Sequence, residues 1–284
     1  MEIIKSSLEI GLMEPVKLLH VTDSHVNDFD DRDDPERQRV AKHSIQNQDR
    51  IYGDALTHFR DMIAYANENC DAFVHSGDMI SLITPLSMEH VRQALDESEN
   101  SFVIAGNHEF SRYCGEAWED IAYRMTNLQL LHSKMKVDML FSAKQVGGVN
   151  IVGIDDGYYQ VEPWQLYRLK REVAKGLPIV LVMHVPLYEQ SLYTKQMEVT
   201  NGYCAYVMGC DEEHLLPFNE YRAVQQRPSK DTLDFIDYVN NEPLIRCVLA
   251  GHIHLAFESR INSHLMQYVT DGGYKNICRE LTLY

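Results

Sequence analysis

Short apolar runs that end in Asp, Asn or His constrain the fold of this chain more than any other feature. The runs are rich in β-branched residues, and several are apolar at consecutive positions, which is typical of strands buried on both faces of a sheet. They occupy Lys17–Thr22, Ala72–His75, Phe102–Ala105, Val149–Ile154, Ile179–Met183 and Cys247–Ala250. Amphipathic helix patterns such as Asp54–Asn67 and Pro163–Lys175 lie between them, so the sequence predicts an α/β layered fold.

The C-terminal part of the chain and one long connection depart from this alternation. Leu255–Ile261, Leu265–Thr270 and Cys278–Leu283 follow one another as strand-like runs, so we expect a more antiparallel second sheet near the C-terminus. Pro186–Lys230 is too long for an ordinary turn and contains five tyrosines. We therefore expect a single domain over residues 1–284 with a cap-like insertion at 186–230. Its tyrosines would either stack on a substrate or form the core of the segment itself.

Five of the strand-like runs each lead into polar residues that can bind metals. The carboxyl ends of such strands are where open α/β sheets bind ligands. The candidate ligands offer seven oxygen and nitrogen donors and no thiolate: Asp23, His25, Asp78, Asn107, His184, His252 and His254. One carboxylate shared between two ions would turn seven donors into two sets of four. This donor set suits two divalent or trivalent transition-metal ions, namely Mn, Fe, Zn, Co or Ni.

The order of these motifs resembles the calcineurin-like metallophosphoesterases, across roughly residues 17–270. The matching motifs are Asp23-Ser24-His25, Gly77-Asp78, Gly106-Asn107-His108-Glu109, His184 and Gly251-His252-Ile253-His254. The resemblance implies a four-layer sandwich of two packed mixed β-sheets flanked by helices. It also implies the ligands of each ion: Asp23, His25 and His254 for one metal, Asn107, His184 and His252 for the other, and Asp78 bridging both.

The same resemblance implies catalytic roles for Asp78, Asn107 and His108. With the metals, Asn107 would hold the phosphoryl oxygens. His108 would contact the phosphate and protonate the leaving group as a general acid. Two metal ions about 3.5–4 Å apart would generate hydroxide at neutral pH and hold the oxygens of an in-line displacement at phosphorus. We therefore expect a phosphoric ester hydrolase that acts by metal-hydroxide attack.

The charge of the chain narrows the substrate. It has 26 basic and 42 acidic residues, a formal net charge of −16, and no basic groove is visible in the sequence. This argues against a long nucleic acid as partner, because phosphate backbones bind the opposite charge. We expect a small phosphodiester or phosphomonoester, with a nuclease or a non-catalytic metal-binding interaction scaffold as the alternatives.

The sequence also predicts a cytoplasmic location without a membrane partner. Six cysteines are scattered along the chain and read as reduced thiols, with a Cys204–Cys210 disulfide as the alternative. The longest nearly uncharged stretch, Gly176–Tyr188, spans 13 residues, whereas a membrane helix needs about 20. The N-terminal segment has no apolar signal-peptide region. The acidic run Asp28–Glu36 is expected to be a solvated loop.

Two further histidines could either support the ligands or serve the fold alone. His20 and His75 lie inside strand-like runs, three residues before a candidate ligand. We expect core histidines, with support of the ligands as the alternative. Asp155 and Asp156 also follow a strand but do not match a ligand position, and they are left out of the predicted site.

Overall fold

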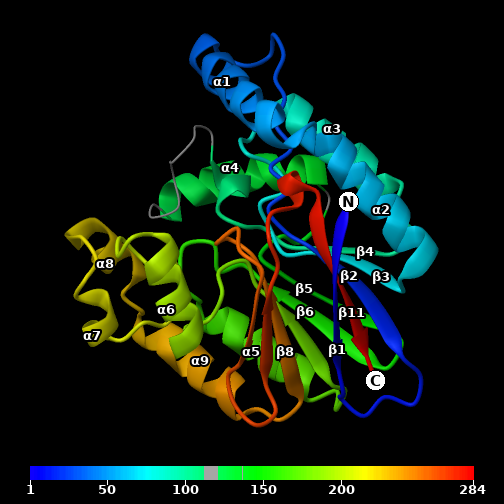
Figure 1. Cartoon of the computed structure of the whole chain (residues 1–284), viewed down its shortest axis with the longest axis vertical. Helices are drawn as coiled ribbons and strands as arrows, with labels where there is room; N and C mark the ends of the chain where they lie inside the picture. The colour runs from blue at the N-terminus through cyan, green and yellow to red at the C-terminus, as the bar shows by residue number, and fades with distance from the viewer. Residues whose placement is uncertain (112–120, 136) are drawn as a thin grey trace.

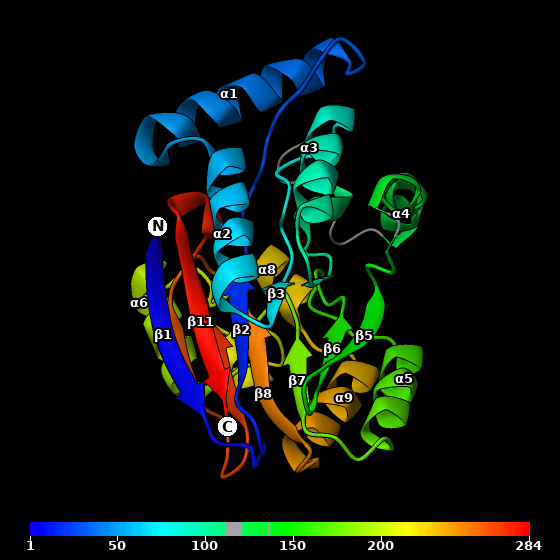
Figure 2. The same cartoon turned by 90° about the vertical axis from the view of Figure 1, so that its right-hand side faces the viewer.

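Two β-sheets packed face to face form the centre of the molecule, with helices on both outer sides (Figures 1 and 2). The computed structural model describes residues 1–111, 121–135 and 137–284. The first sheet has the strand order β1-β11-β2-β3-β4. Its strands are β1 (Glu2–Leu8), β11 (Ile277–Leu283), β2 (Val16–Val21), β3 (Ala72–His75) and β4 (Ser101–Val103).

The second sheet has the order β5-β6-β7-β8-β10-β9. Its strands are β5 (Phe141–Val146), β6 (Val149–Ile154), β7 (Ile179–Val182), β8 (Ile245–Ala250), β10 (Met266–Val269) and β9 (Phe257–Arg260). Both sheets contain parallel and antiparallel pairs, because β2-β3-β4 and β6-β7-β8-β10 are parallel while β2-β11 and β9-β10 are antiparallel. The predicted α/β fold with two mixed sheets is confirmed.

Three apolar clusters hold the layers together. The cluster between the sheets contains buried residues such as Leu18, Val74, Ile104, Val180 and Leu249. A second cluster joins the first sheet to α2 (Ala55–Asn69), α3 (Pro85–Asp96) and α4 (Ile121–Met135). A third joins the second sheet to α5 (Pro163–Val173) and α9 (Lys230–Asn241). Burial of these apolar side chains fixes the sheets against each other and brings the ends of their parallel strands together.

The helices predicted near Asp54–Asn67 and Pro163–Lys175 are confirmed as α2 and α5. The side chain of Asp54 caps α2 by accepting hydrogen bonds from the backbone N–H groups of Leu56 and Thr57. At α5, the side chains of Glu162 and Gln165 form a capping box, and Pro163 occupies the first turn.

The expectation of an antiparallel second sheet at the C-terminus was wrong in part. β10 pairs in parallel with β8 and antiparallel with β9, but β11 crosses into the first sheet between β1 and β2. The reason is burial: β11 is almost entirely buried and takes an interior position, whereas β9 is largely accessible and takes an edge. The edge strands β1 and β5 were not predicted, because their alternating exposed positions weaken the apolar signal.

The prediction of a solvated loop at Asp28–Glu36 was also wrong in part. Asp33 is buried and accepts a hydrogen bond from Arg37, at 3.1 Å between Oδ1 and Nη1. Pro35 begins the long helix α1 (Pro35–Tyr52), for which Asp34 is the N-cap. The acidic run therefore anchors a helix that lies across the top of the molecule (Figures 1 and 2).

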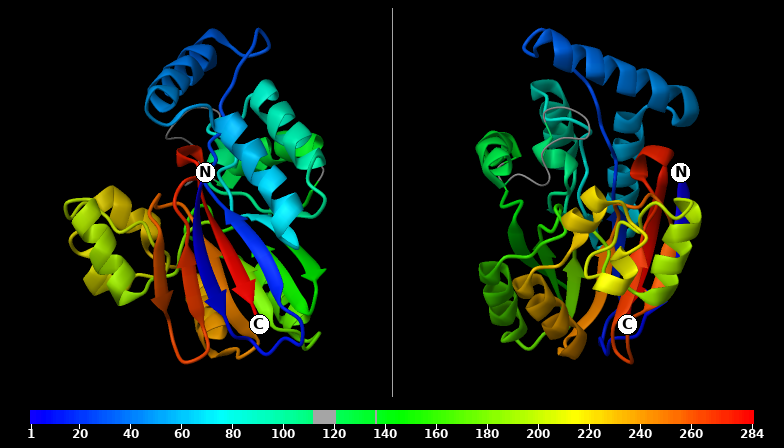
Figure 3. Two further views of the ribbon diagram at one scale, coloured as in Figure 1. Left: turned by 45° about the vertical axis from the view of Figure 1, so that its right-hand side comes forward. Right: turned by 90° about the vertical axis from the view of Figure 1, so that its left-hand side faces the viewer.

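The long connection Pro186–Lys230 contains α6 (Gln190–Val199), α7 (Glu212–Leu215) and α8 (Glu220–Gln226). It lies on the opposite side of the molecule from α2 and α3 (Figure 3). A small apolar cluster of its own includes Leu192, Leu215 and Phe218. That the segment acts as a cap within one domain stays a prediction.

The described cysteines, Cys204 and Cys210 included, are free thiols, and Cys114 lies outside the described residues. Along the part of the chain that the structure describes, no helix is both long and apolar enough to cross a membrane.

Candidate metal centre

The predicted ligands converge because most of them lie in an unusual backbone conformation. Five of the seven have a positive φ, in the left-handed region that side chains with a Cβ rarely adopt. These are Asp23 (49°), His25 (47°), Asp78 (56°), His252 (68°) and His254 (48°). Such conformations persist only where the surrounding structure holds them, and here they turn successive side chains toward one point beyond the strand ends.

Two motif glycines allow this close approach. A Cβ at Gly106 would collide with Oδ1 of Asp78, and a Cβ at Gly251 would collide with the side chains of Thr22 and Asp23. Each glycine therefore leaves room for a carboxylate delivered by a different strand. The glycines in the Gly-Asn-His-Glu and Gly-His-Ile-His motifs are explained by this packing.

The first cluster joins Asp23, His25 and His254. Nε2 of His254 lies 3.1 Å from Oδ1 of Asp23 and 3.2 Å from Nε2 of His25. These three side chains each offer one ligand atom within a sphere that a single metal ion could occupy. The two imidazole nitrogens face each other, so a cation between them could bind both.

The second cluster joins Asp78, His184 and His252. Nε2 of His184 lies 3.1 Å from Oδ2 of Asp78 and 3.2 Å from Nδ1 of His252. Asn107 lies beside it, and its Oδ1 is buried with no hydrogen-bond partner among the described residues. A buried amide oxygen without a partner is costly unless a ligand binds it, so Asn107 fits the predicted fourth donor.

Asp78 lies between the two clusters. Its Oδ2 is 3.1 Å from Nε2 of His184 in the second cluster and 3.9 Å from Nε2 of His25 in the first. Oδ1 accepts a hydrogen bond from the backbone N–H of His108 at 2.8 Å, which fixes the plane of the carboxylate. A carboxylate in this position could bind an ion in each cluster, and the bridging role of Asp78 stays a prediction.

Hydrogen bonds to the outer ring nitrogens orient the histidines. Nδ1 of His184 donates to the carbonyl oxygen of Ser76 at 2.9 Å, so Nε2 is free to bind a cation. The hydroxyl of Tyr159 lies 2.7 Å from Nε2 of His252, and that of Tyr274 lies 3.3 Å from Nδ1 of His254. The sequence analysis missed both tyrosines, since neither belongs to a motif or follows a strand directly.

Two buried carboxylates hold the loops in place. Glu109 accepts hydrogen bonds from the backbone N–H groups of Asp78, Met79 and Gly106. Asp156 accepts from the backbone N–H groups of His184 and Val185. Burial raises the pKa of each carboxyl to about 7. Asp156 was left out of the predicted site. It supports the backbone of His184 and belongs to neither cluster of candidate ligands.

The two histidines inside the strands are core residues that also contact the loops carrying the candidate ligands. His20 is buried and hydrogen-bonded to Ser76 and Thr270, and His75 is buried and hydrogen-bonded to Ser24. They are core residues, and their partners Ser24 and Ser76 belong to the loops that carry the ligands.

The electrostatics of the clusters favour a cation. Burial alone would raise the pKa of Asp23 and of Asp78, but the surrounding histidines hold both pKa values below the usual range. Burial alone would lower the pKa of His184, yet the adjacent Asp78 carboxylate raises it to about 10. Burial lowers the pKa of His25 and of His252 to about 3. Divalent cations would supply the positive charge that these ionised carboxylates require.

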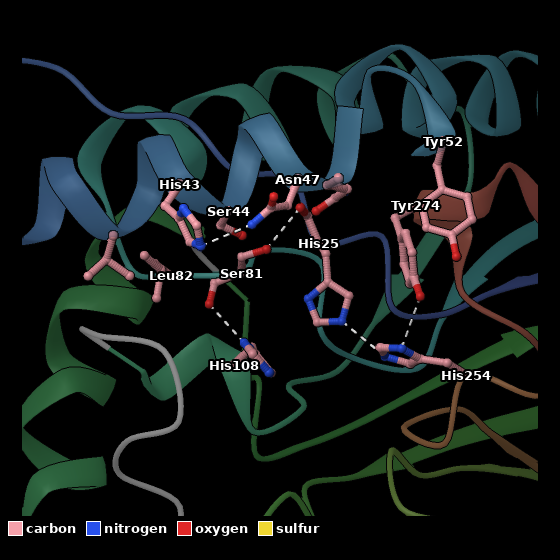
Figure 4. A pocket seen from close by; sticks show the side chains of 12 residues that line it. His25, His43, Ser44, Asn47, Tyr52, Ser81, Leu82, His108, His254 and Tyr274 are labelled. Atoms are coloured by element: carbon pink, nitrogen blue, oxygen red, sulfur yellow. Dashed lines mark hydrogen bonds between the residues drawn. The ribbon is translucent and has the colours of Figure 1, made fainter. Parts of the chain in front are cut away.

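Two pockets meet at the clusters. The larger, about 480 Å³, lies under α1 and reaches His25 and His254 (Figure 4); we call it the α1 pocket. The smaller, about 280 Å³, lies beside α6 and reaches Asp78 and Asn107; we call it the α6 pocket. His108 and His254 line both pockets, so the metal clusters are accessible from two sides.

The fold and the clusters together define a class of protein, an α/β sandwich with a buried His and Asp centre suited to two metal ions. Residues 16–256 match the family model of the calcineurin-like phosphoesterases. The chain belongs to this family, which confirms the resemblance seen in the sequence. No curated protein matches it in sequence.

Solved structures of other proteins share this fold. One is a dimetal phosphatase from Danio rerio, with a TM-score of 0.53 and 14% identity over 92% of this chain and 89% of that one. Another is a purple acid phosphatase from yellow lupin (Lupinus luteus) seeds, with a TM-score of 0.54 and 11% identity over 92% of this chain and 44% of that one. At these identities the likeness shows the fold alone.

Proposed function

We propose that this protein hydrolyses a small phosphodiester or phosphomonoester with two bound transition-metal ions. The observation that carries this proposal is the position of Asp78, whose Oδ2 faces a histidine of each cluster, 3.1 Å from His184 and 3.9 Å from His25. A carboxylate placed in this way can offset the repulsion between two cations. When bound, the ions would lower the pKa of water and neutralise charge on the phosphoryl group.

The residues around the clusters fit the remaining tasks. Nδ1 of His108 donates to the carbonyl oxygen of Ser81 at 2.8 Å, which leaves Nε2 directed at the site, 4.0 Å from Oδ2 of Asp78. In this orientation a protonated His108 can give its Nε2 proton to the oxygen that leaves phosphorus. The unpartnered Oδ1 of Asn107 supports its role as a metal ligand beside the phosphoryl oxygens.

A small substrate is favoured over a nucleic acid. The net charge of −16 repels a polyanion, and no Lys or Arg stands among the described residues that line the two pockets. A nuclease is therefore the weaker reading. The site does not favour a non-catalytic scaffold, because the donors for both ions are present and converge.

A phosphatase assay with defined metal content tests the proposal. Chain purified without chelator should contain two transition-metal ions and should hydrolyse 4-nitrophenyl phosphate or bis(4-nitrophenyl) phosphate when manganese is supplied. Asp78→Asn provides the matched inactive control. Two bound ions with no hydrolysis of either ester, over a range of metals, would favour the scaffold reading instead.

A further inference from the structure

The walls of the two pockets differ in chemistry. No Asp, Glu, Lys or Arg stands among the described residues that line the α1 pocket, and Val40, Leu82 and Tyr274 give it apolar surface. Asn47 and Gln48 also line the α1 pocket, but most of its surface is apolar, whereas polar groups such as those of Gln196 and Thr200 form a larger share of the α6 pocket. A substrate that used both pockets would therefore carry two unlike groups.

The α1 pocket has room for a ring-sized group. Its residues on α1 recur at helical spacing, at positions 40, 44, 48 and 52, so one face of the helix covers the pocket (Figure 4). The ring of Tyr274 stands edge-on to the rings of Tyr52 and His254, with centroids 5.1 and 5.2 Å apart. At about 480 Å³ the pocket lies in the size range of small-molecule sites.

The structure fixes α1 at both ends although little of it is buried. Ahead of the helix, Arg32 pairs with Asp30 and with Glu89 of α3, at 2.7 Å between Nη1 and Oε1 of Glu89. At the other end, Tyr52 packs on Tyr274. Within the helix, only Arg37 and Ala41 are buried. A helix held in this way, with few core contacts, is explained by a role as a wall of the pocket.

The α6 pocket offers an unsatisfied donor. Gln196 is 2% exposed, and its Nε2 is buried with no hydrogen-bond partner among the described residues. Its backbone carbonyl accepts from the N–H of Thr200 at 2.9 Å, so the residue sits in a formed helical turn. Buried amide donors are nearly always paired in folded proteins, and an oxygen atom of a bound ligand would pair this one.

We propose that the preferred substrate is a phosphodiester with two unlike ester groups, an uncharged ring-sized group in the α1 pocket and a polar, oxygen-bearing group in the α6 pocket. This inference rests on the proposed function, since it names the substrate class of the same site. Because His108 and His254 line both pockets, a phosphoryl group at the clusters can direct one ester group into each. Hydrolysis breaks one phosphorus–oxygen ester bond; the water oxygen joins phosphorus and a proton goes to the departing oxygen.

Four esters with the same leaving group separate the two pockets. They are 4-nitrophenyl phosphate, methyl 4-nitrophenyl phosphate, bis(4-nitrophenyl) phosphate and the 4-nitrophenyl ester of thymidine 5′-phosphate. The unmodified chain should have a higher kcat/KM for the last two than for the monoester. A nitrophenyl ring can take the α1 pocket in each diester, so Ser44→Trp, which fills that pocket, should lower the ratio of methyl ester kcat/KM in the variant to that in the unmodified chain about tenfold.

The α6 pocket is tested through its donor. Gln196→Met keeps the length of the side chain and removes the donor, so it should lower the ratio of thymidine to methyl ester kcat/KM about tenfold, mainly through KM. Gln196→Met should leave the first of these two ratios, and Ser44→Trp the second, within about twofold of its value for the unmodified chain. Gln46→Trp, on an exposed position of α1 outside the pocket lining, is the matched control and should change neither ratio.

The outcomes distinguish this inference from the proposed function. Hydrolysis of the esters with both ratios unchanged in the two variants would overturn the assignment of the pockets, as would a wild-type preference for the monoester. Equal changes of both ratios in each variant would show damage to the shared centre and would also overturn it. No hydrolysis of any ester by chain with two ions bound would overturn the proposed function itself. Metal content, measured for every variant, reports an intact centre independently of activity.

Discussion

The strand-end loops and helix α1 face each other across the same pocket, yet they are built by different rules. In the loops, Asp23 and His184 are fully buried, and side-chain carboxylates such as Glu109 and Asp156 hold the backbone from behind. In α1 only Arg37 and Ala41 are buried, and the polar side chains that face the pocket lie partly in solvent. Rigid loops suit groups that must be held in one geometry for chemistry, whereas an exposed helix face can vary without disturbing them.

This contrast predicts that substitutions at the strand ends remove chemistry, while those on the helical walls change only selectivity. Asp78→Asn is the strongest test, because one substitution weakens both metal clusters. We expect the largest loss of activity of any single change, greater than that of His25→Ala. It should exceed the 10- to 100-fold cost of losing an outer hydrogen bond to a ligand.

Elemental analysis alongside kinetics checks the Asp78 prediction. The unmodified chain should bind two ions, and Asp78→Asn should bind fewer under the same metal supply. A more damaging effect of His25→Ala at saturating metal would contradict the bridging position, as would a single firmly bound ion in the unmodified chain.

His108 provides the next largest effect, and only for poor leaving groups. An alkoxide must be protonated as its bond to phosphorus breaks, and a positioned acid contributes about 10²–10⁴-fold there. Nitrophenolate leaves without such help. His108→Ala should therefore slow alkyl ester hydrolysis far more than nitrophenyl ester hydrolysis, with metal content unchanged. Equal losses on the two esters would leave His108 a phosphate-binding residue only.

Removal of the metals should make the stability of the chain depend on the protonation of His184. In the metal-free chain, His184 has a folded pKa of about 10, above its unfolded value near 6.5. The stability that its proton contributes is thus complete below pH 6.5 and is lost as the pH rises toward 10. Metal-bound chain gains nothing from this proton. We expect the difference in Tm between metal-loaded and chelator-treated chain to widen between pH 7 and pH 9, by about 2–4 °C per pH unit.

Thermal unfolding at constant ionic strength measures this difference. His214, a partly buried histidine of α7 that pairs with Asp211 away from the metal clusters, offers a matched comparison, because His214→Gln should leave the pH trend intact. A gap in Tm that stays constant or narrows with rising pH would show that the His184 proton does not stabilise the metal-free fold.

How much of this could be read from the sequence depends on how locally each feature is encoded. Asp23 and His184 follow apolar runs directly and Asp78 comes three residues after one, so their places beyond strand ends could be predicted from the sequence alone. Helix α1 could not, because a helix with two buried residues has no apolar stripe to detect. Tyr159 and Tyr274 were invisible for another reason: their hydroxyls meet His252 and His254 only through tertiary folding, 93 and 20 residues apart in sequence.

A substitution at Tyr159 should have an effect between those expected at the metal ligands and those expected at the pocket walls. Tyr159→Phe removes the hydroxyl that lies 2.7 Å from Nε2 of His252, so metal affinity should fall by about 10- to 100-fold. Tyr158→Phe removes the hydroxyl that donates to Glu162 at 2.8 Å, away from the centre, and serves as the adjacent control. Competition with a metal-binding dye measures both. Equal affinities in the two variants would show that Tyr159 only fills space.

The smallest effect is expected in the 186–230 segment, where the tyrosines divide into two groups. Tyr188 and Tyr193 contact His214 inside the segment, with their hydroxyl oxygens 2.9 Å from its Nε2 and its carbonyl oxygen. Tyr206 instead lines the α6 pocket, with its ring centroid 6.1 Å from that of His252.

This division indicates that Tyr206, and not Tyr188 or Tyr193, should govern substrate choice. Tyr206→Leu should change the ranking among diesters by a few-fold, up to the 1–3 kcal/mol of a stacked base if the polar group is a nucleoside. Tyr193→Leu should lower Tm and leave that ranking unchanged, because its ring packs within the segment. Kinetics on the three diesters, with Tm and metal content for both variants, decide between the two roles. A changed ranking in Tyr193→Leu with none in Tyr206→Leu would mean that the segment acts through its overall position and not through the side chain that lines the pocket.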